Sequence, residues 1–449
     1  MRTVGKLALF VLVALLSSTA LAAGTNSAYR QLSKDIKVSG GATILLSATI
    51  HVRKPTLVYV QSDGVYRPEG AGRAKAFISI DGKKVSNDTH IDWTKSVAPQ
   101  PHTFNIIGAR RLREGKHVVT LQATAADAPA YFVAGTNLSV LTEAATRITD
   151  NALPADSANL SFDTIDTPEG TALPAQGHRK LISNRVMTTG KPIVAMASGT
   201  SRFGGSYGDA MWGIFLNGSE PGIDSMTWSI NDIETGAETQ APMFSQAMFL
   251  SPPARSTVQM VASESPYYVP KMGSTNAVAY AVAAGSRLIT LSGGMNVYGK
   301  ALAPEFPYAS KGRHRRYAYV CIGTNGFKPT CPRSGTEVVL GEGRVCIPPR
   351  HNGVVLFSAK SRVQGDSADA GGTVLLRIKI DGKAVGSTGL QQLAKAPNAV
   401  STRTISASYL ATGKNALAPG CHGVQVTGKA TGDFRNLSMN ADVPLLWFD

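Results

Sequence analysis

Short runs of alternating apolar and polar residues recur along this chain, and three of them end in the same kind of turn. The run Ala-Phe-Ile-Ser-Ile precedes Asp81-Gly82, Met-Trp-Gly-Ile-Phe-Leu precedes Asn217-Gly218, and Leu-Leu-Arg-Ile-Lys-Ile precedes Asp381-Gly382. A period of two is typical of a strand with one buried face. Asp-Gly and Asn-Gly favour tight hairpin turns, because both turn residues take positive φ. The pattern therefore predicts three equivalent β-hairpins.

The same alternation assigns the two faces of these strands. On the third strand we expect Arg377 and Lys379 to face water. The side chains predicted to point into a core are Ala76, Ile78, Ile80, Trp212, Ile214, Leu216, Leu376, Ile378 and Ile380.

A second motif, Leu-x-x-Gly-x-His, occurs at residues 112–117 and again at residues 417–422. Its histidines, His117 and His422, could act as ligands or as acid–base groups, but no nucleophile or orienting carboxylate is visible nearby in the sequence. The middle part of the chain keeps a strand at this point and lacks both the glycine and the histidine. We therefore interpret the motif as a structural corner, in which the imidazole hydrogen-bonds the backbone at the rim of a sheet.

These repeats predict an all-β protein of three tandem antiparallel β-sandwich domains, because helical periodicity is weak throughout. A jelly roll is the first choice, since the long excursion before the second motif would let the chain cross between two sheets. An immunoglobulin-like sandwich is the alternative. The expected segments are a signal peptide at 1–23, sandwich domains at 24–147, 178–297 and 318–449, a linker at 148–177 and a basic linker at 298–317.

All four cysteines lie in the last third of the chain, which predicts disulfide bonds in an exported protein. We favour a bond between Cys346 and Cys421, because the repeats place them on the first and the penultimate strand of the third domain. A bond between Cys321 and Cys331 would then close a short loop. No Cys or His spacing typical of zinc is present, so we expect no metal and no cofactor.

The first residues carry Arg2 and Lys6, an apolar run at 7–16 and an Ala-Leu-Ala cleavage signal at 20–22. The apolar run is too short to span a bilayer, so the pattern predicts a secretory signal peptide. No later segment is long and apolar enough for a transmembrane helix. We expect the mature protein to be secreted, periplasmic or exposed at the cell surface.

The formal net charge of +15 is spread unevenly. Residues 24–147 hold 16 Lys and Arg against 9 Asp and Glu, residues 148–300 hold 9 against 12, and residues 301–449 hold 18 against 9. A basic exported protein is drawn to anionic surfaces, although basicity can also serve solubility alone. The densest basic run predicts either a polyanion contact or an exposed hinge. Its candidate contacts are Lys311, Arg313, Arg315 and Arg316.

The segment from Val60 to Lys75 mixes charged, aromatic and glycine residues and is the most site-like stretch of the first domain. Farther along, hydrogen-bonding side chains flank a tryptophan that could stack on a sugar or pack in the core. The candidate ligand-binding residues are Asp63, Tyr66, Arg67, His90, Asp92 and Trp93. A solvated hairpin tip without a ligand is the alternative for the loop.

No nucleophile elbow, zinc-protease motif or phosphate loop is present, so we expect no enzyme. The leading hypothesis is an exported, non-enzymatic binding or adhesion protein at the cell envelope that recognises glycans or other anionic polymers. Two alternatives stay open: a self-associating structural subunit of a surface layer or appendage, and a polysaccharide-active hydrolase, whose two carboxylates one sequence cannot place. No helix-turn-helix or finger pattern indicates specific nucleic-acid binding.

Overall fold

The computed structural model describes most of the chain outside its first 26 residues and a set of loops. The described residues are 27–93, 101–142, 147–155, 179–188, 190, 192–204, 207–218, 227–232, 240–249, 252–263, 279–293, 295–298, 320–321, 335–349, 352–366, 372–393, 400–431, 436–442 and 445–448. The predicted signal peptide, the basic run at 311–317 with its four candidate contacts, and Cys331 lie outside this range.

Copy 1 of the repeat is a jelly roll of two antiparallel sheets. Its inner sheet has the strand order β1-β9-β3-β7 and its outer sheet the order β2-β8-β4-β6. This double Greek key defines an eight-stranded jelly roll, as the sequence predicted. The strands are β1 (Ala28–Gln31), β2 (Ile36–Val52), β3 (Thr56–Pro68), β4 (Gly72–Ile80), β5 (Lys83–Lys84), β6 (Thr89–Trp93), β7 (His102–Leu112), β8 (Gly115–Phe132) and β9 (Asn137–Thr142).

Copy 2 repeats this topology strand for strand. Its inner sheet has the order β10-β18-β12-β15, and its outer sheet has the order β11-β16-β13-β14. The strands are β10 (Arg147–Ala152), β11 (Arg179–Met187), β12 (Ile193–Gly204), β13 (Tyr207–Leu216), β14 (Thr227–Asp232), β15 (Gln240–Phe249), β16 (Arg255–Ser263), β17 (Ala279–Val282) and β18 (Arg287–Ser292).

Copy 3 has an inner sheet with the order β19-β28-β22-β25 and an outer sheet with the order β21-β26-β23-β24. In the inner sheet β27 also pairs with β22, and β20 pairs with β27. At Ile230 and Thr402, β14 of copy 2 pairs with β25, so the outer sheet of copy 2 continues into the inner sheet of copy 3. Its described residues also contain a short 3₁₀ helix, Gly413–Asn415. The strands are β19 (Met295–Tyr298), β20 (Val320–Cys321), β21 (Glu337–Ile347), β22 (Val355–Asp366), β23 (Gly372–Ile380), β24 (Lys383–Leu393), β25 (Val400–Ala411), β26 (Gly420–Thr431), β27 (Asn436–Asp442) and β28 (Leu445–Phe448).

The first strand of each copy corrects the predicted linkers. β10 begins at the boundary of the stretch predicted as a linker at 148–177, and it pairs with β18, the last strand of copy 2. β19 ends at residue 298, where the second linker was predicted to begin, and it pairs with β28 in copy 3. Both are edge strands, and the polar sequence of β10, Arg-Ile-Thr-Asp-Asn-Ala, resembles a loop because one side of an edge strand stays exposed.

Each sandwich encloses its own apolar core. One buried cluster lies within residues 28–140, one within 153–288 and one within 340–430. Every side chain predicted to point inward is buried or, for Leu216, partly buried against the core. The predicted faces of these strands are therefore confirmed, although Arg377 and Lys379 are only half-exposed.

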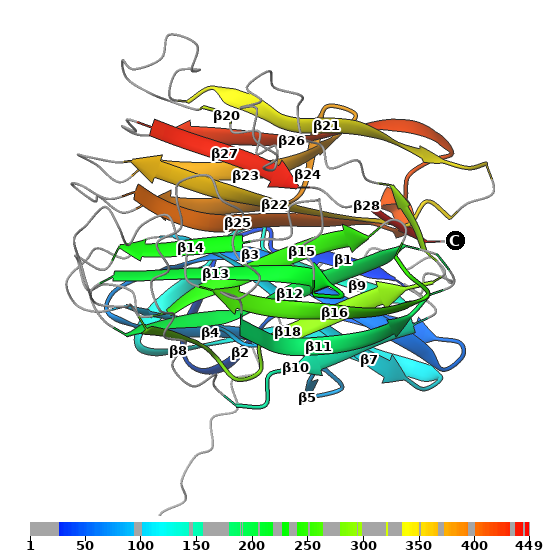
Figure 1. The fold of residues 1–449 in the computed structure, drawn as a ribbon, viewed down its shortest axis with the longest axis horizontal. Coiled ribbons are helices and arrows are strands. Elements are labelled where there is room, and N and C mark those ends of the chain that lie inside the picture. The colour runs from blue at the N-terminus through cyan, green and yellow to red at the C-terminus, as the bar shows by residue number, and fades with distance from the viewer. Residues whose placement is uncertain are drawn as a thin grey trace, which may run out of the picture.

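A fourth apolar cluster joins the three copies to one another. Figure 1 shows the strands of copy 3, in yellow to red, above the green strands of copy 2, with the blue and cyan strands of copy 1 behind and below. The outer-facing side chains of all three inner sheets pack together between the copies. The cluster consists of Tyr59, Ile107, Leu141, Val194, Met196, Phe244, Met248, Ile289, Leu291, Leu356 and Leu410. Because full burial of one such side chain stabilises by about 1.5–3 kcal/mol, this packing binds the three jelly rolls into one body.

A buried polar network lies beside this cluster, around Asp63. Its carboxylate accepts hydrogen bonds from Asn105 Nδ2 at 2.7 Å, from Gln61 Nε2 at 2.9 Å and from Ser408 Oγ of copy 3. Gln61 also donates to Ser358 Oγ of copy 3 at 3.3 Å. Burial raises the pKa of Asp63, and the hydrogen bonds from Ser408 and its other donors oppose that rise.

Ser358 extends the network into copy 2. Its hydroxyl donates to Oε1 of Gln246 at 2.9 Å, and Gln246 Nε2 donates back to the Ser358 carbonyl oxygen at 3.1 Å. On the other side, Ser198 of copy 2 donates to the Asn105 carbonyl oxygen at 2.7 Å. Polar groups of all three copies are therefore hydrogen-bonded to one another where water is excluded, which specifies one relative placement of the copies.

Asp63→Ala removes the acceptor that three buried donors share. We expect the free energy of unfolding to fall by about 2–4 kcal/mol, because the buried donors of Asn105, Gln61 and Ser408 lose this acceptor without gaining water. Urea unfolding measures this change. The control is Glu114→Ala at an exposed acid of copy 1, which should change stability by less than about 0.5 kcal/mol. Equal effects of the two substitutions would contradict the role of the network.

Candidate functional site

Two of the predicted ligand-binding residues lie in the interior of the protein. Asp63 and Tyr66 were expected in an exposed loop, but β3 continues through both of them, and each is at most 1% exposed. Tyr66 packs against Phe104 and Phe132 in the core of copy 1. The expectation was wrong because both faces of β3 are buried, one in its own sandwich and one between the copies, so polar residues there need not be solvated.

Among the remaining predicted residues, the structure describes the side chain of Arg67 alone. Arg67 is exposed, and its guanidinium lies 5.3 Å from the ring centroid of Tyr131 and 3.7 Å from the carboxylate of Asp35. His90, Asp92 and Trp93 lie on β6, which pairs with β4, and their side chains are outside the described set. They stay candidates.

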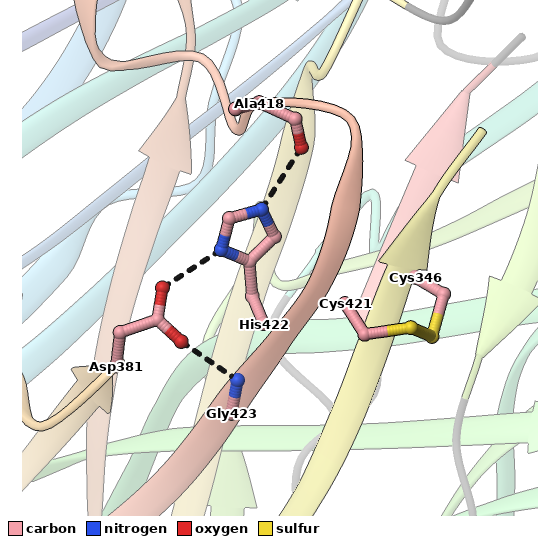
Figure 2. The surroundings of a disulfide bond; sticks show 6 residues. All are labelled: Cys346, Asp381, Ala418, Cys421, His422 and Gly423. Carbon is pink, nitrogen blue, oxygen red and sulfur yellow. Dashed lines mark hydrogen bonds and ion pairs between the residues drawn. A yellow bond between two sulfur atoms is a disulfide. The ribbon is translucent and has the colours of Figure 1, made fainter. Parts of the chain in front are cut away.

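The two motifs noticed in the sequence meet in one structural unit, an Asp–His clamp. In copy 3, shown in Figure 2, His422 Nδ1 lies 2.7 Å from Oδ2 of Asp381, and Nε2 lies 2.9 Å from the carbonyl oxygen of Ala418. Oδ1 of Asp381 accepts a hydrogen bond from the Gly423 N–H at 2.9 Å. The histidine thus hydrogen-bonds the backbone at the sheet rim, as the sequence predicted, and is also oriented by a carboxylate that sequence reasoning had not found.

Copy 1 contains the same clamp. His117 lies 2.8 Å from Oδ2 of Asp81 and 2.9 Å from the carbonyl oxygen of Arg113, and the Val118 N–H donates to Oδ1 of Asp81 at 3.0 Å. Both ring nitrogens face oxygen acceptors, so the protonated imidazolium, which donates twice, is the form that fits. A ring engaged on both sides has no nitrogen left to activate a nucleophile, which makes the clamp structural.

Copy 2 forms equivalent hydrogen bonds at this corner with uncharged side chains. Asn217 replaces the aspartate, and its Oδ1 still accepts a hydrogen bond from the Thr257 N–H at 2.7 Å. Ser256 replaces the histidine, and its hydroxyl donates to the carbonyl oxygen of Pro253 at 2.9 Å. Copy 2 thus lacks both the aspartate and the histidine of the clamp, as expected for two side chains that interact.

The clamps shift the pKa values of their members in opposite directions. The hydrogen bond to Asp81 raises the pKa of His117, while the Ala418 carbonyl and Asp381 together raise that of His422. Burial tends to raise the pKa of Asp81, but hydrogen bonds from His117 and the Val118 N–H lower it overall. The hydrogen bond from His422 lowers the pKa of Asp381.

The favoured disulfide is confirmed. Cys346 on β21 and Cys421 on β26 face each other across paired strands and are bonded, as Figure 2 shows beside the clamp. At the corresponding place in copy 1, His51 pairs with Lys116, so the bond is a local addition to copy 3. Cys321 lies on β20, and its predicted bond to Cys331 remains a prediction because Cys331 is outside the described residues.

An open groove on copy 2 is the candidate functional site. It lies where β10, at the edge of the inner sheet, meets β11 and β16 of the outer sheet, and its volume is about 810 Å³. Asn151 crosses this edge and donates to the Ser183 carbonyl oxygen at 3.2 Å. The groove is lined by Thr149, Asn151, Lys180, Ser183, Arg185, Asn217, Gly218, Thr257 and Gln259.

The strands around the groove concentrate positive charge. Five cations on them are exposed, and the one acid of these strands, Asp150, pairs with Arg287 at 2.6 Å. Arg147 lies close to the groove, because its guanidinium donates to the Met187 carbonyl oxygen on β11 at 3.2 Å. Residues 148–300 carry more acids than bases overall, so this basic face is a local feature. The cations are Arg147, Arg179, Lys180, Arg185 and Arg255.

At the Lys180 position the other two copies carry no cation. Strand register and a shared β-bulge place Lys180 where copy 1 has Ile44 and copy 3 has Val339. Arg185 corresponds to Thr49 and to Arg344, and copy 3 offsets its arginine with Glu342 at the Ser183 position. Sequence reasoning missed Lys180 and Arg185. Comparison of the repeats could have found Lys180, since a cation stands where the other copies carry an aliphatic residue.

Within the described ranges, no group of three or more His, Cys, Asp and Glu side chains is placed to hold a metal ion. No helix in the same ranges has the length and apolar character to cross a bilayer.

Comparisons with known proteins place the chain in no family. No family model and no curated protein matches it. Among solved structures it is similar to the tandem CBM22 modules of Paenibacillus barcinonensis Xyn10C, with 12% identity over 61% of this chain and 99% of that one, at a TM-score of 0.17.

Two further solved structures show the same remote similarity. That of infectious bursal disease virus strain Gx has 10% identity over 96% of this chain and 74% of that one, at a TM-score of 0.22. The extracellular domain of ANXUR1 from Arabidopsis thaliana has 10% identity over 58% and 82%, at a TM-score of 0.16. Scores this low carry no argument about function, so the proposal below is drawn from the site.

The clamps make stability depend on pH. Because the folded-state pKa of each imidazole is raised, the imidazole stabilises the folded protein fully below about pH 6.5, its usual pKa in an unfolded chain. This stabilisation is lost as pH rises through the folded-state pKa. The aspartates, whose pKa is lowered, lose theirs only as pH falls through their folded-state values. We expect the wild type to lose about 0.5–1 kcal/mol more than His117→Ala/His422→Ala between about pH 5.5 and 8.5.

Urea unfolding at several pH values measures this difference. His51→Ala is the matched control, because this exposed histidine of copy 1 has no carboxylate clamp. Identical pH profiles for the wild type and the double variant would contradict a charged clamp.

Proposed function

We propose that this chain is an exported, non-catalytic binding protein that holds an acidic glycan of the cell envelope in the groove of copy 2. The observation that carries the proposal is the cluster of five exposed cations on β10, β11 and β16. Carboxylate, sulfate and phosphate groups of a polymer would pair with such a row of cations. Export rests on the predicted signal peptide.

The lining of the groove favours a sugar polymer over other polyanions. Between the cations it offers the amides of Asn151, Asn217 and Gln259 and the hydroxyls of Ser183 and Thr257, which can hydrogen-bond sugar hydroxyl groups. Nucleic acid would share the charge attraction, but its sequence-specific readers place a helix or a β-ribbon in a groove of the duplex. We therefore assign the ligand to acidic glycans, and DNA serves as a competitor in the test.

Lys180→Ala/Arg185→Ala should weaken binding to an acidic oligosaccharide. Each cation near an anionic partner contributes about 1 kcal/mol, so the loss of both corresponds to a roughly 30-fold higher Kd. The double variant should also depend less on salt than the wild type, because less of its binding free energy is electrostatic. Isothermal titration calorimetry at low and moderate salt measures both effects.

The matched control is Arg344→Ala, which removes the corresponding arginine of copy 3, and it should change the affinity less than about twofold. An equal loss in the control would show that net charge, and not the groove, determines binding. Duplex DNA that binds as tightly as the acidic glycan would contradict the assigned ligand, and a wild type that binds no acidic glycan would contradict the function.

A further inference from the structure

We propose that Asn217 deamidates spontaneously, and that its conversion to aspartate places a negative charge in the groove and weakens the binding of an anionic ligand there. The chemical part of the proposal stands alone. The effect on binding rests on the proposed function.

The local backbone exposes the reacting atoms. Asn217 and Gly218 are both exposed in the turn that follows β13, with φ of +52° and +79°. Nothing lies within 4 Å of the position that a Cβ of residue 218 would occupy. Since glycine has no side chain of its own, the Gly218 nitrogen can approach the side-chain carbon of Asn217 without obstruction.

The side-chain amide is also polarised toward attack. Oδ1 of Asn217 accepts the Thr257 N–H at 2.7 Å, which holds the amide in place and stabilises the negative charge that develops on this oxygen when the carbon is attacked. The amide nitrogen, which is the leaving group, has no hydrogen-bond partner among the described residues.

The reaction needs water alone. The Gly218 backbone nitrogen gives up its proton and forms a bond to Cγ of Asn217, and the Cγ–Nδ2 bond breaks with release of ammonia. A cyclic succinimide remains, and water opens it to aspartate or isoaspartate. In sum one water is consumed and one ammonia is released, with no oxidant or reductant.

The fold already accommodates the aspartate product. Asp81 and Asp381 occupy the same turn in copies 1 and 3, with φ of +51° and +49°, and their carboxylates accept the same backbone hydrogen bond. Those carboxylates are neutralised by histidines, whereas copy 2 carries Ser256 at that point. A carboxylate at 217 would therefore have no histidine partner and would lie in the groove that Lys180 and Arg185 line.

A second Asn-Gly pair in the described chain provides an internal control. Asn352 also precedes a glycine, Gly353, but the Cβ that Gly353 lacks would overlap the carbonyl of Leu417, and the Gly353 carbonyl accepts the Leu417 N–H at 2.9 Å. This packed backbone restricts the movement that brings the attacking nitrogen to the side chain.

The chemistry is tested by incubating the wild-type protein at mildly alkaline pH and quantifying the amide-to-acid change by peptide mass spectrometry. We expect Asn217 to convert several times faster than Asn352. Conversion of Asn217 at the rate of Asn352 or below would overturn the chemical part. In a parallel sample, Asn217→Ser should show no change at this position.

The effect on binding is tested with two variants and the acidic oligosaccharide. Asn217→Asp should weaken binding about 5–10-fold, since the new carboxylate offsets the charge of one groove-lining cation, Lys180 or Arg185. Asn217→Asp/Ser256→His should regain most of the affinity at about pH 6, because the added imidazolium rebuilds the clamp of the other copies.

The outcomes separate this inference from the proposed function. If Asn217→Asp binds like the wild type while Lys180→Ala/Arg185→Ala loses binding, the charge effect is overturned and the groove remains. If rescue by Ser256→His fails although the protein is folded, the clamp explanation is overturned. If the wild type binds no acidic glycan, the proposed function falls, and the relative deamidation rates still decide the chemical part.

Discussion

The arrangement of this protein depends on the burial of each inner sheet on both faces. One face of β3, β12 and β22 closes its own jelly roll, and the other meets the two neighbouring copies in a shared apolar cluster. At the centre the Asp63 carboxylate accepts hydrogen bonds from side chains of copies 1 and 3, and Ser358 links that network to copy 2. Apolar packing supplies the driving force for this assembly, while the polar network restricts the copies to one placement.

Away from this junction, the three copies differ at one corner of their outer sheets. The same corner serves as an ionised clamp in copies 1 and 3, and as a neutral Asn217–Ser256 version in copy 2. Copy 3 adds a disulfide at this edge, between Cys346 and Cys421. Copy 2 lacks the aspartate of the clamp and carries cations around a polar groove. The proposed binding site is thus a specialised copy of a surface whose other versions are structural.

The sequence was sufficient for the parts of the fold that repeat locally. Alternating runs, Asp-Gly turns and the spacing of the second motif predicted three jelly rolls and the Cys346–Cys421 bond, because these depend on contacts within one copy. Contacts between copies could not be read in this way. Asp63 looked like a loop residue, since nothing in its neighbourhood shows that Asn105 and Ser408 would satisfy it. Edge strand β10 resembled a linker in the sequence. Lys180 could be recognised as a distinctive cation only after the strand register aligned it with Ile44 and Val339 of the other copies.

The most direct test of the account is a crystal structure of the protein with a short acidic oligosaccharide. We expect a ligand along β11, with its acidic groups beside Lys180 and Arg185 and its hydroxyl groups toward Asn151 and Gln259. We expect no ligand at the equivalent surfaces of copies 1 and 3. A ligand bound at the junction of the three copies, or equally at all three outer sheets, would contradict the assignment of binding to the groove.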